Sequence, residues 1–434
     1  MLAAVGCTQA PESAEQFEIS RSDYHQRLQG FWLGQSIANW TGLITEMDKI
    51  GGDGWDGKGA GFYTRANWGG PDEPNIWGGW GPGTEGDSID FFLDPPNETW
   101  GADDDTDIEY IYLRTTFEED ATRLSAEQIR RAWLKHIYSD ENTPFKTADG
   151  HPENYLWVSN QTAHDLMRGG VLPPETSDPA RNPHYEMIDA QLTTEIFGLF
   201  APGRPSAALD LAYLPIRTTA RGDAAAIAEF YVVMYSLASK VNPDWGTGRQ
   251  LNWMAERAQA RFEDGSYSAA MYDFVKTMHA SGAPWEATRD SLQERYQIRM
   301  EDGYDWAARD EVCGGCFAAG INFAAGMVSL FYGEGDLLET IRIGSLAGWD
   351  SDNPTATWGG LIGFLVGKEG VEKAFGRRLA GGFDIHRTRG GFDSGIDTFD
   401  NMASMGVTVV DRVVERQLGG SVDADRDVWV IPRR

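Results

Sequence analysis

The sequence predicts an all-α globular protein, and three observations lead to this prediction. Most of the chain divides into segments whose apolar residues recur at helical spacing, separated by short connectors. Strand patterns are few, the best being residues 428–431, and they do not alternate with the helical patterns. Hydrophobic residues make up 41% of the 434 positions, which is enough for a sizeable core. Helices without recurring β-α alternation are typical of an all-α fold.

The predicted helices follow one another along the chain from residue 24. The first spans 24–44 and contains Gly30, Gly34 and Gly42, which we expect to be points of close helix packing. The helix at 125–138 begins with a capping-box pattern, because Gln128 stands three residues after Ser125. The other predicted helices are 106–117, 163–170, 185–200, 224–240, 253–262, 267–280, 285–296, 316–332, 335–346, 355–367 and 398–417.

Two segments depart from this pattern. Residues 51–100 are rich in Gly, Trp, Pro, Asp and Asn, and we expect an ordered, irregular insertion there. Residues 312–333 contain no charged side chain, so their length alone is compatible with a membrane helix. Because this run is diluted by glycines and contains Asn322, it favours a helix packed inside the protein.

The N-terminus and the cysteines carry weaker signals. Residues 2–7, ending in Cys7, resemble the end of a bacterial lipoprotein signal, although a basic region and a long apolar stretch do not precede them. We expect residues 1–20 to be a signal remnant and tether, with an ordinary frayed N-terminus as the alternative. Cys313 and Cys316 lack a second pair for zinc. They are predicted to be small apolar residues of a helix, with a disulfide as the alternative.

The charge excludes one class of partner and favours another. The formal net charge of −29 repels phosphate backbones, so we expect no nucleic-acid partner. Acidic and other oxygen-bearing residues crowd into 103–107 and again into 348–354. Carboxylates this close repel one another unless a cation lies among them, and hard divalent cations prefer oxygen ligands.

Each acidic segment also has a purely structural interpretation. Asn353 and Pro354 are typical of the N-cap and first residue of a helix over 355–367, and acidic residues are common at helix N-termini. Two such segments, each opening an apolar helix, nevertheless favour a shared site. We therefore predict a magnesium-type site with one or two ions, provided that the fold brings the segments together.

Three separated segments resemble the ADP-ribosylglycohydrolase family, which includes the dinitrogenase-reductase-activating glycohydrolases. Residues 27–34 (Arg-Leu-Gln-Gly-Phe-Trp-Leu-Gly), continuing to Glu46, are similar to the family's N-terminal Gly-rich helix that ends in a glutamate. Residues 103–106 are similar to its Thr-Asp-Asp-Thr, and 348–353 to its Gly-Gly-Asp-Thr-Asp-Thr. Residues 188–198 resemble a helix of a bacterial branch. The resemblance extends from about residue 24 to past 367, so we expect residues 21–434 to form one catalytic domain.

The resemblance implies an all-α fold that holds two Mg²⁺ or Mn²⁺ ions between helices, with Ca²⁺ as an alternative ion. Asp103 and Asn353 stand where the family has threonines and still offer oxygen, whereas Asn39 follows Ala38 where many members have Gly-Asp. Glu46 matches a glutamate near the metals and the scissile bond. The metal ligands implied in this way are Asp103, Asp104, Asp105, Asp350, Asp352 and Asn353.

The activity implied is hydrolysis of an N- or O-ribofuranosyl bond in an ADP-ribosyl or nucleoside-like substrate. Glu46 is expected to act as general acid or general base, and Asp105 to share the role of base. Trp349 is a candidate stacking surface, with core packing as the alternative. Asp189 and Gln191 are candidates for polar substrate contacts, with helix–helix hydrogen bonding as the alternative.

The N-terminal pattern bears on location and substrate. We expect a periplasmic or cell-surface lipoprotein that meets the membrane only through a lipid on Cys7, or otherwise a cytoplasmic protein. Outside the cytoplasm, pentofuranosyl glycans become alternative substrates, which the Trp-rich insertion would suit. A catalytically silent, metal-dependent ligand-binding protein is a further alternative, and a purely structural, crystallin-like use of the fold is the last, which the metal motifs disfavour.

Overall fold

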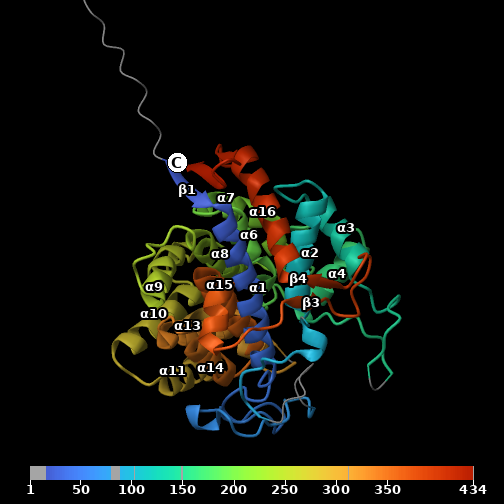
Figure 1. Ribbon diagram of the computed structural model, residues 1–434. Coiled ribbons are helices and arrows are strands. Elements are labelled where there is room, and N and C mark those ends of the chain that lie inside the picture. Colours follow the sequence, from blue (N-terminus) through green and yellow to red (C-terminus); the bar gives the residue numbers. More distant parts are fainter. Residues whose placement is uncertain (1–15, 80–87, 102, 148–149, 311, 434) are drawn as a thin grey trace, which may run out of the picture.

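The computed structural model describes residues 16–79, 88–101, 103–147, 150–310 and 312–433. Within these ranges helices dominate and the sheets are small, so the predicted all-α fold is confirmed. The helices gather around a central pair, α1 (Arg21–Leu43, blue in Figure 1) and α15 (Asp352–Phe375, orange). Cys7 lies outside the described residues, and the division of the chain near residue 20 stays a prediction.

Glycines allow α1 and α15 to approach closely, as their spacing predicted. A Cβ on Gly34 would overlap the carbonyl of Gly359, and a Cβ on Gly42 would overlap the backbone of Asp352. Gly30 packs on α15 in the same way. Because almost no side chain separates the two helices, the C-terminal end of α1 is fixed directly against the acidic segment that opens α15.

The other helices surround this pair. α16 (Phe399–Arg416) packs along α1, and α14 (Leu337–Ala347) leads into α15. α8 (Gly222–Leu237) is buried along most of its length. The remaining helices are α2 (Asp104–Glu118), α3 (Ala126–His136), α4 (Val158–Arg168), α5 (Ala190–Thr194), α6 (Ile196–Phe200), α7 (Pro205–Thr219), α9 (Thr247–Ala258), α10 (Tyr267–Ala280), α11 (Trp285–Leu292), α12 (Trp306–Arg309) and α13 (Ala319–Gly333).

Two small sheets join distant parts of the chain. β6 (Val428–Pro432), the strand predicted from the sequence, pairs antiparallel with both β1 (Gln16–Ser20) and β5 (Ser421–Asp423). In the second sheet, β3 (Gly382–Asp384) lies between β2 (Thr99–Trp100) and β4 (Ile396–Thr398). The first sheet ties the start of the described chain to its end, and the second ties the end of the insertion to the segment after α15.

Most helices lie close to their predicted bounds. The capping box of Ser125 and Gln128 is present, and the prediction 267–280 coincides with α10. Helix α7 was not predicted, because Pro215 in its interior obscures the helical signal. The described part of 51–100 has only short 3₁₀ turns and the two-residue β2, as expected of an irregular insertion. None of the helices in the described ranges is long and apolar enough to span a membrane.

Two local predictions are wrong. Cys313 and Cys316 do not lie in a helix; they close a turn ahead of α13 through a disulfide bond. Gly314 and Gly315 adopt φ of +67° and +81°, a left-handed conformation that ends any helical path between the two sulfurs.

The other wrong prediction concerns the start of α15. This helix begins at Asp352 rather than at residue 355, and its N-cap residue is Ser351 instead of Asn353. Asn353 therefore lies inside the first turn, where its side chain donates to Asp105 and does not cap the helix. The helical segment also continues to Phe375, past Gly367, whose φ is +71°.

Candidate metal centre and active site

The fold brings the two acidic segments together at the N-terminal ends of α2 and α15. The Asn39 side-chain amide, on α1, donates to Asp103 Oδ2 at 2.5 Å and to Asp352 Oδ2 at 3.1 Å. Asn353 Nδ2 donates to Asp105 Oδ2 at 2.5 Å. These bonds join residues that are 64, 313 and 248 positions apart, and they connect the first acidic segment to the second. The two segments therefore meet, as the predicted metal site requires.

Glu46, Asp350 and Asp352 form the tightest carboxylate group. One ligand oxygen from each lies within 4.8 Å of the others, and Asp350 and Asp352 are buried while Glu46 keeps partial exposure. Two backbone hydrogen bonds fasten the loop that carries Glu46 to the loop that carries Asp350: Met47 N donates to Trp349 O at 3.0 Å, and Trp349 N to Lys49 O at 2.9 Å. The group is therefore held by backbone structure on both sides.

The electrostatics of this group favour a cation. Burial raises the pKa of Glu46 well above its ordinary value, and the charge of Asp352 raises it further. Burial and then the charge of Glu46 raise the pKa of Asp350, while burial and then Asp350 raise the pKa of Asp352. No lysine or arginine in the described ranges forms an ion pair with these three carboxylates. A metal ion bound among them would supply the missing positive charge and favour their ionised form.

Unpartnered oxygens show that the residues present fit a hard cation. A buried acceptor without a donor costs about 1–3 kcal/mol, so several in one place call for a ligand. Oxygen is also the ligand type that Mg²⁺, Mn²⁺ and Ca²⁺ prefer. The buried side-chain oxygens that lack a hydrogen-bond donor at this site are Asn39 Oδ1, Glu46 Oε2, Asp189 Oδ2, Asp352 Oδ1 and Asn353 Oδ1.

Asn160 of α4 forms hydrogen bonds with three carboxylates, those of Asp104, Asp105 and Asp189. Asn160 Nδ2 donates to Asp104 Oδ2 at 3.0 Å and to Asp105 Oδ1 at 2.8 Å, and its backbone N–H donates to Asp189 Oδ1 at 2.8 Å. Burial, and then the charges of Asp103 and Asp189, raise the pKa of Asp104 to about 7. Burial raises the pKa of Asp105 well above its ordinary value, and Asp104 is the next cause.

Asp103 differs from its neighbours because it caps a helix, and both of its oxygens accept hydrogen bonds, as do both oxygens of Asp105. Asp103 Oδ1 accepts from Thr106 N at 2.6 Å, which makes Asp103 the N-cap of α2, and Asp103 Oδ2 accepts from Asn39. The capping interpretation of the first acidic segment thus applies to this residue. Its assignment as a metal ligand stays a prediction.

A family model described as ADP-ribosylglycohydrolase matches residues 20–403. The chain belongs to the ADP-ribosylglycohydrolase family. The resemblance that the sequence motifs indicated is confirmed, and membership supports a glycohydrolase-type function. A solved structure described as an "ADP-ribosylglycohydrolase-related protein complex" is similar at 15% identity and a TM-score of 0.44, covering 90% of this chain and 98% of that chain. Among curated proteins, none matches this chain.

In this member of the ADP-ribosylglycohydrolase family, the three predicted substrate contacts have different surroundings. The Trp349 ring is fully buried and packs edge-on against Phe62 with centroids 4.8 Å apart, which favours the packing alternative. Gln191 Nε2 donates to Ala319 O at 3.3 Å, and its Oε1 has no donor. Asp189 faces the carboxylate site through Asn160. Substrate contact by Trp349, Asp189 and Gln191 stays a prediction.

Sequence patterns did not reveal a buried ion pair beside the glycohydrolase site. Arg389 Nε lies 3.1 Å from Asp107 Oδ2, and both side chains are fully buried. The guanidinium also donates to the carbonyls of Asn154 and Tyr155, at 2.7 and 2.8 Å. Arg389 thereby holds the loop 154–155 against α2. No local motif marks it, because its partners come from segments far away in the sequence.

Tyr155 is the second residue of that loop. Burial, and then the charges of Asp103 and Asp104, raise the pKa of its phenol well above the ordinary value. Its ring lies 4.1 Å from the ring of His386, and nearby Trp157 is 56% exposed. Tyr155 is also a non-glycine residue with φ of +52°, a conformation that clusters at functional sites. Tyr155 and Trp157 are therefore substrate-contact candidates that the motifs missed.

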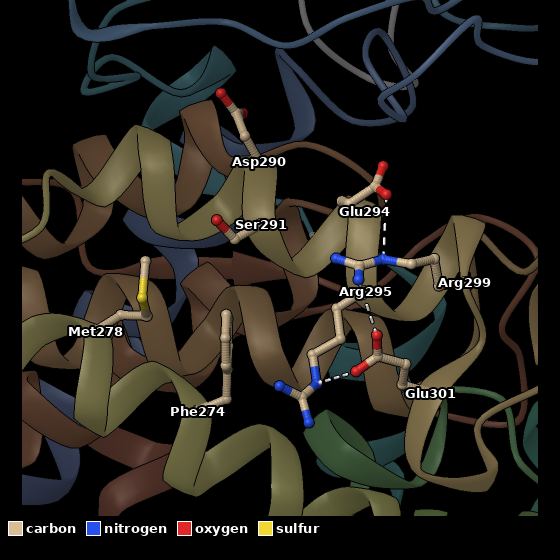
Figure 2. A pocket seen from close by; sticks show the side chains of 8 residues that line it. All are labelled: Phe274, Met278, Asp290, Ser291, Glu294, Arg295, Arg299 and Glu301. Carbon is tan, nitrogen blue, oxygen red and sulfur yellow. Dashed lines mark ion pairs between the residues drawn. The ribbon is translucent and has the colours of Figure 1, made fainter.

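A surface pocket elsewhere does not belong to this site. It encloses about 430 Å³ beside α10 and α11, and Figure 2 shows its two arginines paired with Glu294 and Glu301. Arg295 lies 3.2 Å from Glu301, and Arg299 lies 3.1 Å from Glu294. None of the lining residues is a member of the carboxylate site, and the paired charges leave no free cation or anion for a ligand.

Proposed function

We propose that this protein is a metal-dependent glycoside hydrolase that cleaves an N- or O-ribofuranosyl bond in an ADP-ribosyl or nucleoside-like substrate. The observation that supports this most directly is the group formed by Glu46, Asp350 and Asp352, whose oxygens converge within 4.8 Å without a protein cation. Family membership supports the glycohydrolase chemistry. We infer that Tyr155 and Trp157, whose ring centroids lie 6.3 Å apart, offer aromatic surface for a sugar or a base.

We expect one or two Mg²⁺ or Mn²⁺ ions, with Ca²⁺ as the alternative. When bound, such an ion polarises substrate oxygens and lowers the pKa of water. Glu46 joins the ligand set predicted from the motifs, because it shares an oxygen cluster with Asp350 and Asp352. The residues that would hold the ions are Glu46, Asp103, Asp104, Asp105, Asp350, Asp352 and Asn353.

The chain's own groups supply the acid–base chemistry. Glu46 is the carboxyl of the tight group that keeps partial exposure, and burial raises its pKa well above the ordinary value, as suits a general acid. It is suited to give a proton to the leaving group or to take one from water, and Asp105 shares the role of base. Departure of the leaving group builds positive charge on the ribose ring, and the surrounding carboxylates stabilise that charge.

A second candidate is an exported furanosidase that acts on pentofuranosyl glycans. The observation that favours it is the Cys313–Cys316 disulfide, because disulfides persist mainly in oxidising compartments. It agrees with the lipoprotein-like residues before Cys7, so we propose a periplasmic or cell-surface protein anchored through a lipid on that cysteine. Nucleic acid is not proposed as a partner, since the net charge of −29 opposes it.

A substrate screen in the presence of Mn²⁺ tests the proposal. Purified protein is incubated with ADP-ribosyl-arginine, ADP-ribosyl-serine, nucleosides and pentofuranosyl glycans, with Asp350→Asn as the inactive variant and Asp393→Asn, at an exposed aspartate, as the matched control. We expect release of a ribose-containing product that Asp350→Asn abolishes and Asp393→Asn preserves. Turnover of only the pentofuranosyl glycans would favour the second candidate. Mn²⁺ binding without turnover of any substrate would indicate a silent ligand-binding protein.

A variant of Glu46 tests its role separately. Glu46→Gln removes the titrating group and keeps the shape and one oxygen ligand. We expect the chemical step to slow by about 10²–10⁴-fold while the substrate still binds. A turnover rate equal to that of the wild type would remove Glu46 from the mechanism.

A further inference from the structure

The turn closed by the Cys313–Cys316 disulfide leads directly into residues 317–319. This segment is joined by backbone hydrogen bonds to the segment that precedes Asp189. Ile188 N donates to Phe317 O at 3.0 Å, and Ala319 N donates to Glu186 O at 2.9 Å. These two backbone bonds flank the segment that ends at Asp189. The residues after the disulfide therefore hold one wall of the site in place.

Asn322 connects the same turn to the other wall. It is fully buried in the first turn of α13, and its Nδ2 donates to Cys316 O at 2.8 Å and to Ala318 O at 3.0 Å. Its Oδ1 accepts from the backbone N–H of Asp350 at 3.2 Å. Both ends of the Asn322 amide are thus hydrogen-bonded: the NH₂ group bonds to the disulfide turn, and the oxygen bonds to the backbone of a predicted metal ligand.

The backbone before Asp350 needs such support. Gly348 has φ of +95°, and Trp349, which is not a glycine, has φ of +58°. A non-glycine residue in the left-handed region is strained and persists only where neighbouring structure enforces it. Without Asn322 the N–H of Asp350 would also lose its acceptor in a buried environment, which is costly. Both costs oppose the conformation that aims the Asp350 carboxylate at Glu46 and Asp352.

We propose that Asn322 is the positioning residue for Asp350, and that the Cys313–Cys316 disulfide keeps the carbonyl acceptors of Asn322 in place. This inference rests on the metal centre proposed above. Asn322 contacts neither the substrate nor an ion; it acts by fixing the backbone from which the ligand projects. Loss of Asn322 is therefore expected to weaken metal binding without removing a ligand.

Mn²⁺ titration calorimetry on the full chain tests the inference, together with amide hydrogen exchange of the metal-free protein. Asn322→Ala removes the link, and a Cys313→Ser, Cys316→Ser double variant removes the disulfide. Asn182→Ala is the matched control, because Asn182 is equally buried, donates to Thr176 O at 3.2 Å and accepts from His184 N at 3.0 Å. No bond of Asn182 leads to the carboxylate site.

We expect Asn322→Ala to weaken Mn²⁺ binding by about 10-fold or more, as for other residues that orient a ligand. The double cysteine variant should weaken it less, in the same direction, and both should speed exchange in a peptide spanning 348–353. Asn182→Ala should lower thermal stability and leave affinity and this exchange unchanged.

Wild-type affinity and exchange in Asn322→Ala, or an equal loss of affinity in Asn182→Ala, would overturn the positioning role. If Asn322→Ala weakens Mn²⁺ binding while the double cysteine variant keeps wild-type affinity and exchange, the role proposed for the disulfide is overturned. If the wild type binds no Mn²⁺ while Asn322→Ala still speeds exchange at 348–353, the metal centre fails and the structural hold of Asn322 on this segment is supported.

Discussion

The stability of the metal-free protein is expected to fall as pH rises from 5 to 7.5, and Asp104 provides the clearest case. Burial and the charges of Asp103 and Asp189 raise its pKa to about 7, whereas an aspartate in an unfolded chain titrates near 3.9. Because the folded pKa is the higher one, the folded protein binds the extra proton. The corresponding stability is complete below about pH 4 and is lost as pH rises through about 7.

The size of the effect follows from the shift. One pKa unit corresponds to about 1.4 kcal/mol, so the full loss attributable to Asp104 is on the order of 4 kcal/mol, of which about 2.5 kcal/mol falls between pH 5 and 7.5. We expect Asp104→Asn, which cannot ionise, to gain that amount relative to the wild type over this interval. The measurement is urea unfolding followed by tryptophan fluorescence, in EDTA, at a series of pH values.

Saturating Mn²⁺ should reverse the trend for the wild type, because ligand carboxylates must lose their protons to bind the ion. Asp393→Asn, at an exposed aspartate, should run parallel to the wild type in EDTA. Parallel pH profiles for the wild type and Asp104→Asn would refute the reasoning, since they would mean that the buried carboxyl is not held protonated by its neighbours.

Three further predictions concern packing, a buried charge and the substrate. Gly34→Ala places a methyl group against a backbone carbonyl of α15. In urea unfolding we expect it to destabilise the protein by about 1–3 kcal/mol. Gly246→Ala, where a Cβ meets open space, should have little effect. Arg389→Met leaves Asp107 buried and unpaired, and should cost about 3–5 kcal/mol by the same measurement; an unchanged midpoint would contradict the pairing. Trp157→Ala tests the proposed binding surface: it should raise KM for a substrate found in the screen and leave kcat nearly unchanged in steady-state kinetics. A fall in kcat at constant KM would exclude a simple binding role.

Much of the fold could be predicted from the sequence, because the signals are local. Helical spacing of apolar residues located most helices, and the glycines of residues 24–44 indicated the close contact that α1 makes with α15. Where a local signal was ambiguous, the prediction erred. Asn353 and Pro354 match the pattern of a helix start. In the structure, however, the Asn353 side chain donates a hydrogen bond to Asp105, and the helix begins earlier, at Asp352.

The partners of the site could not be predicted in the same way. Asn39, Asn160 and Asn322 each donate or accept across tens to hundreds of residues, and an isolated asparagine has no distinguishing pattern. The disulfide is a similar case, because the spacing of Cys313 and Cys316 is compatible with a helix as well as with a bonded turn. In the structure, the left-handed conformation of Gly314 and Gly315 excludes the helix and gives the bonded turn.

The sequence by itself determined the helical class, the two acidic segments and the family, because periodicity and motif are properties of neighbouring residues. Only the tertiary structure decided which carboxylates meet. The glycine-lined contact of α1 with α15 sets Glu46 beside Asp350 and Asp352, whereas Asp103 is drawn into capping α2. Burial then gives these carboxyls their raised pKa values, and burial depends on packing from every part of the chain.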